Sequence, residues 1–182
     1  MIHNYHLINY TILFFLKEKK TKIIVLAALF AALTCVATMV VKIPSPLKGY
    51  INLGDCMVLL AGWLLPPGFS FLAAGLGSAL ADVFAGYFVY APVTFAVKGL
   101  MAVCAYFIYR RLSVKPGELP AAIASGIAAE VIMIAGYYIF EGFMYGFGAS
   151  LVNIPPNAVQ GVAGIIIGVL LLKVFRKTKI SL

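Results

Sequence analysis

Three ionisable side chains lie inside long apolar stretches of this sequence: Asp82 and Lys98, both within the segment 75–98, and Glu130. An ionised group costs several kcal/mol inside a bilayer, so such residues usually face a bundle interior and are paired or functional. An acid and a base at that depth can bind a polar solute. This predicts a binding site surrounded by the rest of the chain. Structural roles stay open, because Asp82 and Lys98 can neutralise each other and a protonated Glu130 can donate between helices.

The composition places these residues in a membrane. Of the 182 residues, 63% are hydrophobic and 11% are charged, which is more apolar surface than a water-soluble domain of this length can bury. The runs between charges approach the ~20 helical residues that cross a hydrocarbon core. The net charge of +8 is explained by the bias of Lys and Arg toward cytoplasmic loops, and no nucleic-acid partner is expected.

The number of spans depends on one short segment. Spans are expected at 23–41, 69–85, 91–109, 120–140 and 155–174, with a short apolar piece at 55–65 that ends at Pro66-Pro67-Gly68. If this piece is a separate helix, the protein is an all-α bundle of six transmembrane helices with both termini cytoplasmic. Only Lys42 and Lys48 would then lie outside, whereas five spans would place most basic residues outside. The positive-inside tendency favours six.

Two domains are expected on this basis. Residues 1–21 form an N-terminal tail that can lie in the membrane interface, and residues 22–182 form the six-helix domain. Within six spans, every strongly polar group lies in the outer half of the membrane or near its middle. This asymmetry predicts a cavity that opens outward and is sealed inward.

Other polar residues belong to the same outer half. Asp55 opens the second span, although it can be only an N-cap, and Asn157 and Gln160 can be only interhelical donors. Six tyrosines gather there and form either an interfacial belt or a surface for stacking on a flat heterocycle: Tyr50, Tyr87, Tyr90, Tyr137, Tyr138 and Tyr145. The candidate substrate-binding residues are Asn52, Asp55, Asp82, Tyr87, Tyr90, Lys98, Glu130 and Asn157.

Small residues in the first span offer a helix-packing surface. Ala27 and Ala31, and Ala28 and Ala32, form two AxxxA pairs, which let another helix approach closely. The cysteines Cys35, Cys56 and Cys104 have no metal-type spacing, so neither a metal site nor a disulfide is expected.

These features together resemble the S component, the substrate-binding subunit, of energy-coupling factor (ECF) vitamin transporters. The likeness covers residues 22–179 and is carried by three stretches: LAALFAALT, GYINLGDCMVLLAGWLLPPG and GLGSALADVFAGYFVYAPVTFAVKG. It is nearest to the branch with riboflavin, hydroxymethylpyrimidine and pyridoxine-type carriers.

The resemblance implies a multi-pass protein of a bacterial plasma membrane that captures a small heterocyclic vitamin or precursor, of hydroxymethylpyrimidine or pyridoxine type, from outside. The loop 42–54 would be a lid. The alanines Ala27, Ala28, Ala31 and Ala32 would contact a transmembrane coupling subunit, which carries two ATPase subunits. The chain has no phosphate-binding glycine–lysine motif, so it is not expected to bind ATP. As an S component it is expected to use no cofactor and to be no enzyme.

Two alternatives remain within transport: a riboflavin-specific S component, or a stand-alone proton-coupled carrier that uses Asp82 and Glu130 as proton sites. An intramembrane enzyme is disfavoured, because the spans contain neither His nor a GxSxG sequence to supply a nucleophile and base.

Overall fold

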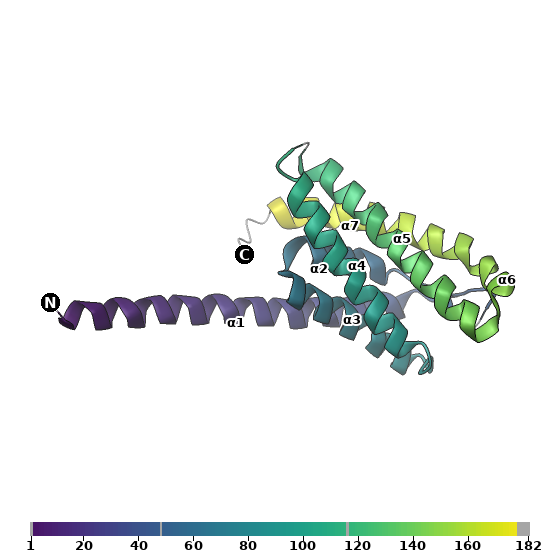
Figure 1. Cartoon of the computed structure of the whole chain (residues 1–182), viewed down its shortest axis with the longest axis horizontal. Helices are drawn as coiled ribbons and strands as arrows, with labels where there is room; N and C mark the ends of the chain where they lie inside the picture. Colours follow the sequence, from purple (N-terminus) through teal and green to yellow (C-terminus); the bar gives the residue numbers. More distant parts are fainter. Residues whose placement is uncertain (1, 48, 116, 178–182) are drawn as a thin grey trace.

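A computed structural model describes the backbone of residues 2–47, 49–115 and 117–177, and side chains from residue 20 onward. The chain is mainly helical (Figure 1). Its long helices are α1 (Ile2–Val40), α3 (Pro67–Phe84), α4 (Ala91–Leu112), α5 (Glu118–Tyr145) and α7 (Ile154–Lys177). The shorter elements are the antiparallel strands β1 (Ile43–Pro44) and β2 (Tyr50–Ile51), and the helices α2 (Gly54–Leu64), α6 (Phe147–Ser150) and η1 (Leu151–Asn153).

The predicted six-helix bundle is confirmed. Five helices of the described residues have the length and hydropathy to cross a membrane, while α2 has only 11 residues. Proline sets the end of α2: Leu65, which precedes Pro66, has the extended backbone that a residue before proline prefers. At its other end, the side chain of Asn52 accepts a hydrogen bond from the Gly54 amide at 2.8 Å, which satisfies one of the orphan donors of the first turn.

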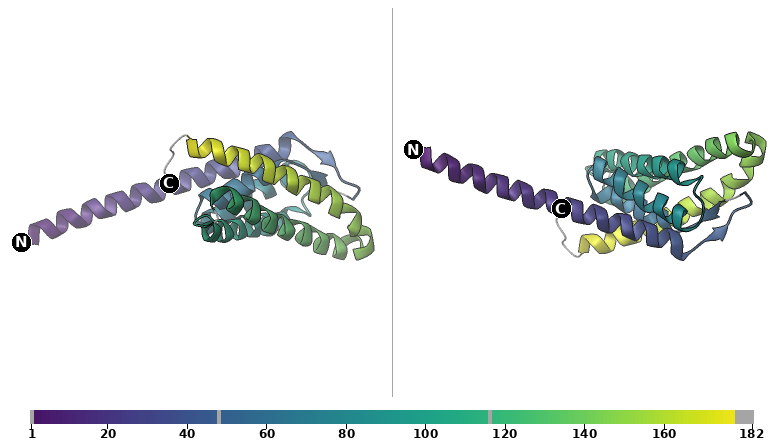
Figure 2. Two further views of the ribbon diagram at one scale, coloured as in Figure 1. Left: turned by 90° about the horizontal axis from the view of Figure 1, so that it is seen from above. Right: turned by 90° about the horizontal axis from the view of Figure 1, so that it is seen from below.

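The predicted N-terminal tail is continuous with the first span. The backbone of α1 is helical from Ile2, and its first half projects beyond the bundle (Figure 2). Placement of residues 1–21 in the membrane interface stays a prediction. Met1, and residues 178–182 of the predicted six-helix domain, lie outside the described residues.

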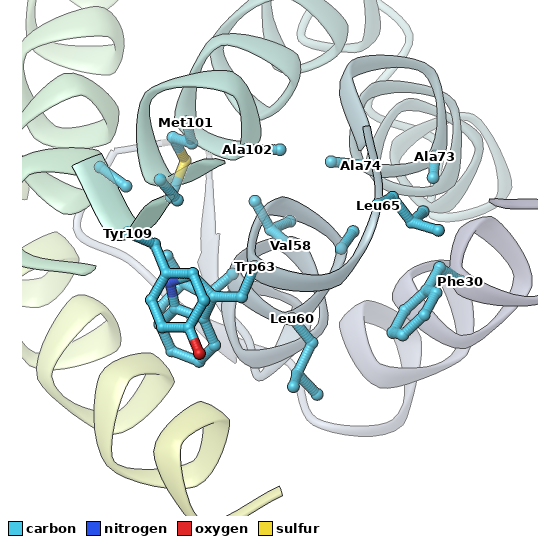
Figure 3. Packing of buried hydrophobic residues seen from close by; sticks show 14 of the residues in the cluster. Phe30, Val58, Leu60, Trp63, Leu65, Ala73, Ala74, Met101, Ala102 and Tyr109 are labelled. Carbon is cyan, nitrogen blue, oxygen red and sulfur yellow. The ribbon is translucent and has the colours of Figure 1, made fainter. Parts of the chain in front are cut away.

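The short helix α2 occupies the centre of the bundle, where it contacts α1, α3, α4, α5 and α7. Trp63, Leu59 and Leu60 are fully buried on it, and the ring of Trp63 lies 6.1 Å from that of Tyr109 (Figure 3). The indole Nε1 donates to Ser125 Oγ at 2.9 Å, so this polar atom is paired inside the core. The core thus forms around α2, while large apolar side chains of the surrounding helices face outward.

The two alanine pairs of α1 face different ways. Ala27 and Ala31 pack against the buried core, and a side chain at Gly77 of α3 would collide with the Ala31 carbonyl. Ala28 and Ala32 are exposed. Ala28 and Ala32 therefore remain accessible on the outer face of α1, and contact of the four alanines with a coupling subunit stays a prediction.

Candidate substrate site

A cavity opens at the end of the bundle where the β-hairpin, the α3–α4 turn, the end of α5 and the start of α7 meet. The cavity itself has a volume of about 40 Å³. It lies within a hollow of about 410 Å³ that includes its open mouth. The free space inside the cavity is therefore small. The described lining residues are Gly49, Tyr50, Asn52, Asp82, Tyr87, Tyr90, Thr94, Tyr137, Glu141, Asn157 and Gln160.

One wall links the hairpin loop to the last turn of α3. The hydroxyl of Tyr50 donates to Asp82 Oδ1 at 2.7 Å, and the Tyr50 ring lies 5.1 Å from that of Tyr87, tilted by 52°. Burial, followed by the charge of Asp82, raises the pKa of the Tyr50 phenol well above its ordinary value. Tyr50 therefore remains a hydrogen-bond donor at physiological pH, and its contact with Asp82 holds the loop over the cavity.

The opposite wall is built around Glu141, which is 3% exposed. Asn153 Nδ2 lies 2.9 Å from each carboxyl oxygen of Glu141, and the Tyr90 hydroxyl donates to Oε1 at 3.4 Å. Asn153 Oδ1 in turn accepts from the Leu47 amide of the loop at 3.3 Å. Asn153 thus ties the loop to the carboxyl group that lines the cavity.

An ion pair lies beneath the cavity. Lys98 Nζ contacts Asp55 Oδ1, and the two side chains are 4% and 0% exposed. Gln160 Nε2 donates to the other oxygen of Asp55 at 2.6 Å, while Gln160 Oε1 accepts from the Asn52 amide at 2.8 Å. Gln160 therefore forms the floor, with the cavity above it and the ion pair below. The suggestion that Asp82 neutralises Lys98 is wrong, because Lys98 pairs with Asp55. The suggestion that Asp55 serves only as an N-cap is also wrong, because Asp55 lies inside α2.

Glu130 lies between α5 and α7, apart from the cavity. It is 5% exposed, and neither carboxyl oxygen has a hydrogen-bond partner within the described part of the chain. A side chain at Gly161 would approach Glu130 Oε2 to 3.0 Å, and one at Gly164 would approach Oε1 to 3.3 Å. These glycines let the two helices close over the carboxyl group.

Comparison with known proteins identifies the family of this chain. Residues 18–177 match the family described as the S component of the ECF-type riboflavin transporter. The chain belongs to this family. An S component is the substrate-binding subunit of a vitamin transporter, so this chain is a multi-pass membrane protein and not an enzyme.

One curated relative and two solved structures are similar to this chain. The S component is 36% identical over 134 residues to a Pyrococcus woesei protein described as an uncharacterized protein in the gap 3′ region, covering 73% of this chain and 87% of the relative. Its fold is similar to that of the S component of a bacterial ECF transporter, with a TM-score of 0.70, 20% identity and coverage of 89% and 99% of the two chains. It is also similar to an S component for biotin, with a TM-score of 0.58, 19% identity and coverage of 86% and 93%.

The S component brings together some of the residues expected at its site and separates others. Asn52, Asp82, Tyr87, Tyr90 and Asn157 line the cavity, whereas Asp55, Lys98 and Glu130 lie buried outside its lining. The candidate set omitted Glu141, because the fifth span was expected to end at residue 140 and α5 continues to Tyr145. Its spacing of four from Tyr137 would have placed Glu141 on the same helix face.

Charge separates the two ends of the S component. Apart from Lys42, the described lysines and arginines outside the core lie at the end opposite the cavity: Lys20, Lys22, Arg110, Arg111, Lys115, Lys173, Arg176 and Lys177. The positive-inside tendency predicts that this end faces the cytoplasm. The cytoplasmic location of both termini stays a prediction, and the distribution of charge supports it.

Proposed function

We propose that this S component captures a small heterocyclic vitamin or precursor, of pyridoxine or hydroxymethylpyrimidine type, from outside the cell. The observation that carries the proposal is the small cavity beneath the hairpin loop, with its tyrosine walls and hydrogen-bonding groups. Pockets for small ligands combine apolar or aromatic walls with a few placed polar groups. A cavity with so little free space suits a single substituted ring better than a fused ring system.

In this proposal, the tyrosine rings contact the faces of the heterocycle and the polar groups bind its edge. Asp82 and Glu141 accept hydrogen bonds from hydroxyl or amino substituents, and Asn157 can both donate and accept. A solute that lacks a partner group would leave a buried carboxyl or amide unpaired, which is the physical basis of discrimination here. The loop 42–54 closes over the solute through Tyr50 and Asn153.

Delivery across the membrane would then depend on partner subunits. The outward stripe of α1 around Ala28 and Ala32 also exposes Val25, Leu29 and Val36, which makes it a flat apolar surface suited to a transmembrane helix. We assign this stripe to the coupling subunit, and ATP hydrolysis to the two ATPase subunits that the coupling subunit carries.

Purified S component tests the proposal. Mass spectrometry of the solute that co-purifies, followed by titration with pyridoxine, hydroxymethylpyrimidine and riboflavin, should identify a single-ring ligand. Asp82→Asn should weaken its binding about tenfold or more, which corresponds to the loss of roughly 1.4 kcal/mol expected for a hydrogen bond to a charged group. The control is Glu118→Gln at the opposite end, which should bind normally. Binding of none of these solutes, with nothing co-purifying, would refute the proposal.

Riboflavin is the second candidate, favoured by the name of the matched family. Its fused rings and hydroxylated chain would require Tyr50 and Tyr87 to separate, since these rings now lie in contact with centroids 5.1 Å apart. Tight binding of riboflavin with no measurable binding of the single-ring compounds would decide in its favour.

The buried, unpartnered carboxyl of Glu130 favours a further candidate, a stand-alone proton-coupled carrier, since intramembrane carboxyls often serve as proton relays. Uptake by cells that lack the coupling subunit, abolished by a protonophore while ATP is maintained, would support it. Uptake that requires the coupling subunit and survives the protonophore would reject it.

A further inference from the structure

We infer that the cavity selects a solute with a net positive charge, carried by a protonated or quaternary nitrogen on or next to its aromatic ring. The inference rests on the proposed function and names the charge class of the substrate. It starts from the charges in the cavity wall, where α3 contributes Asp82 and α5 contributes Glu141. These two carboxyl residues are 6% and 3% exposed.

No positive charge in the wall balances them. Among the described lining residues there is no Lys, Arg or His. The nearest buried cation, Lys98, is already paired with Asp55 beneath the floor. A further described cation near the site, Lys42, is exposed, and its Nζ lies 6.0 Å from the ring centroid of Tyr50. The described lining of the cavity therefore has two acids and no base.

The groups that bind these acids are neutral. Asp82 accepts from the Tyr50 hydroxyl, and Glu141 accepts from the Tyr90 hydroxyl and from Asn153. Both oxygens of Glu141 accept, which is the pattern of an ionised carboxylate. Hydroxyl and amide donors satisfy the oxygen atoms but supply no net charge, and a buried charge is costly unless a charge of the opposite sign accompanies it. A cationic solute would supply that charge.

The aromatic walls favour the same kind of solute. The rings of Tyr87 and Tyr50 are tilted by 52° with centroids 5.1 Å apart, and those of Tyr87 and Tyr90 are at 83° and 6.2 Å. The hydroxyls of Tyr50 and Tyr90 are bound to the carboxyl groups, so contact of these side chains with a solute would be made through their rings. Cations are attracted to such faces, and several tyrosines at different angles form the kind of cage that binds quaternary ammonium groups.

A matched series of three compounds isolates the effect of charge. Pyridoxamine, pyridoxine and 4-pyridoxate share one ring and carry an aminomethyl cation, a neutral hydroxymethyl group and a carboxylate at the same position. Titration of the detergent-purified full chain at pH 7 should give binding about tenfold or more tighter for pyridoxamine than for pyridoxine, a difference of roughly 1.4 kcal/mol. Binding of 4-pyridoxate should be undetectable.

Variants test whether the two carboxyl groups are the cause. Glu141→Gln and Asp82→Asn should reduce the ratio of the pyridoxamine affinity to the pyridoxine affinity, whereas Glu118→Gln should leave it unchanged. If a variant fails to fold, the wild-type series and the net charge of the co-purifying solute, measured by mass spectrometry and pH titration, still decide the question. A cationic co-purifying solute supports the inference even if none of the three compounds binds.

Several outcomes would overturn the inference alone: pyridoxine or 4-pyridoxate binding as tightly as pyridoxamine, a neutral or anionic co-purifying solute, or an affinity ratio unchanged in both carboxyl variants. Complete absence of solute binding, in titration and on purification, would overturn the proposed function together with the inference.

Discussion

Removal of either partner from the Asp55–Lys98 ion pair should strongly destabilise the bundle. The two side chains are 0% and 4% exposed, so solvent cannot compensate for the loss. Lys98→Met would leave the Asp55 carboxylate with the amide of Gln160, and Asp55→Asn would leave the ammonium near the Tyr137 ring, 5.6 Å from its centroid. Breaking a buried pair in this way costs about 3–5 kcal/mol.

The loss of stability can be measured as a fall in the melting temperature. At roughly 2–4 °C for each kcal/mol in a chain of this size, each single variant should melt about 6–20 °C below the wild type in the same detergent. The double variant, which leaves no charge unpaired, should melt above at least one of the single variants. The control is the exposed pair of Arg176 and Glu118, with an N–O distance of 2.9 Å and side chains 51% and 53% exposed. Glu118→Gln should change the free energy of unfolding by about 1 kcal/mol or less.

Two results would refute this reasoning. Single variants that melt within about 2 °C of the wild type, a shift of no more than roughly 1 kcal/mol, would mean that the pair is absent or freely hydrated. A double variant whose loss equals the sum of the two single losses would mean that Asp55 and Lys98 are not coupled.

Three further predictions concern packing, the loop and the partner subunit. Gly77→Ala should lower the free energy of unfolding by about 1–3 kcal/mol through overpacking against α1, whereas Gly68→Ala, with open space around it, should melt no lower than the wild type. Asn153→Ala should speed hydrogen exchange at Leu47 and substrate dissociation, measured by mass spectrometry and stopped flow; unchanged rates in both would contradict its role in holding the loop. Ala28→Trp should keep substrate binding but lose co-purification with the coupling subunit, while Leu100→Trp on the exposed face of α4 should retain both; a retained complex for Ala28→Trp would contradict the α1 surface.

The fold was largely predictable from the sequence because its signals are strong and local. Apolar runs gave the long helices, Pro66 and Pro67 separated α2 from α3, and charge favoured six helices over five. Ala74, Ser78 and Asp82 are spaced by four and so share one face of α3, and they are 0%, 1% and 6% exposed. These inferences need only helix periodicity and the cost of polar groups in lipid.

The partners of the buried charges were not predictable in the same way. Hydropathy gives the approximate depth of a charged residue but not the rotation of its helix, so only Asp82 was considered as a partner of Lys98 and its pairing with Asp55 was missed. Glu141 was missed because a helix that extends past the apolar run has no hydropathy signal at its end. The inward turn of Ala27 and Ala31 also depends on how closely α3 approaches, which is set by Gly77 across the interface.

The length of α2 has a consequence for how the protein is made. Eleven residues at ~1.5 Å each extend about 16 Å, roughly half of a hydrocarbon core of ~30 Å. This segment is therefore too short to be inserted as an independent membrane span. It would have to enter the lipid as a hairpin with α3, joined at Pro66-Pro67, and become stable only when its neighbours surround it. Beyond the first turn of α2, toward Asn52, the chain does not continue as helix: Gln160 binds both Asp55 and the Asn52 amide, and the cavity lies above Gln160.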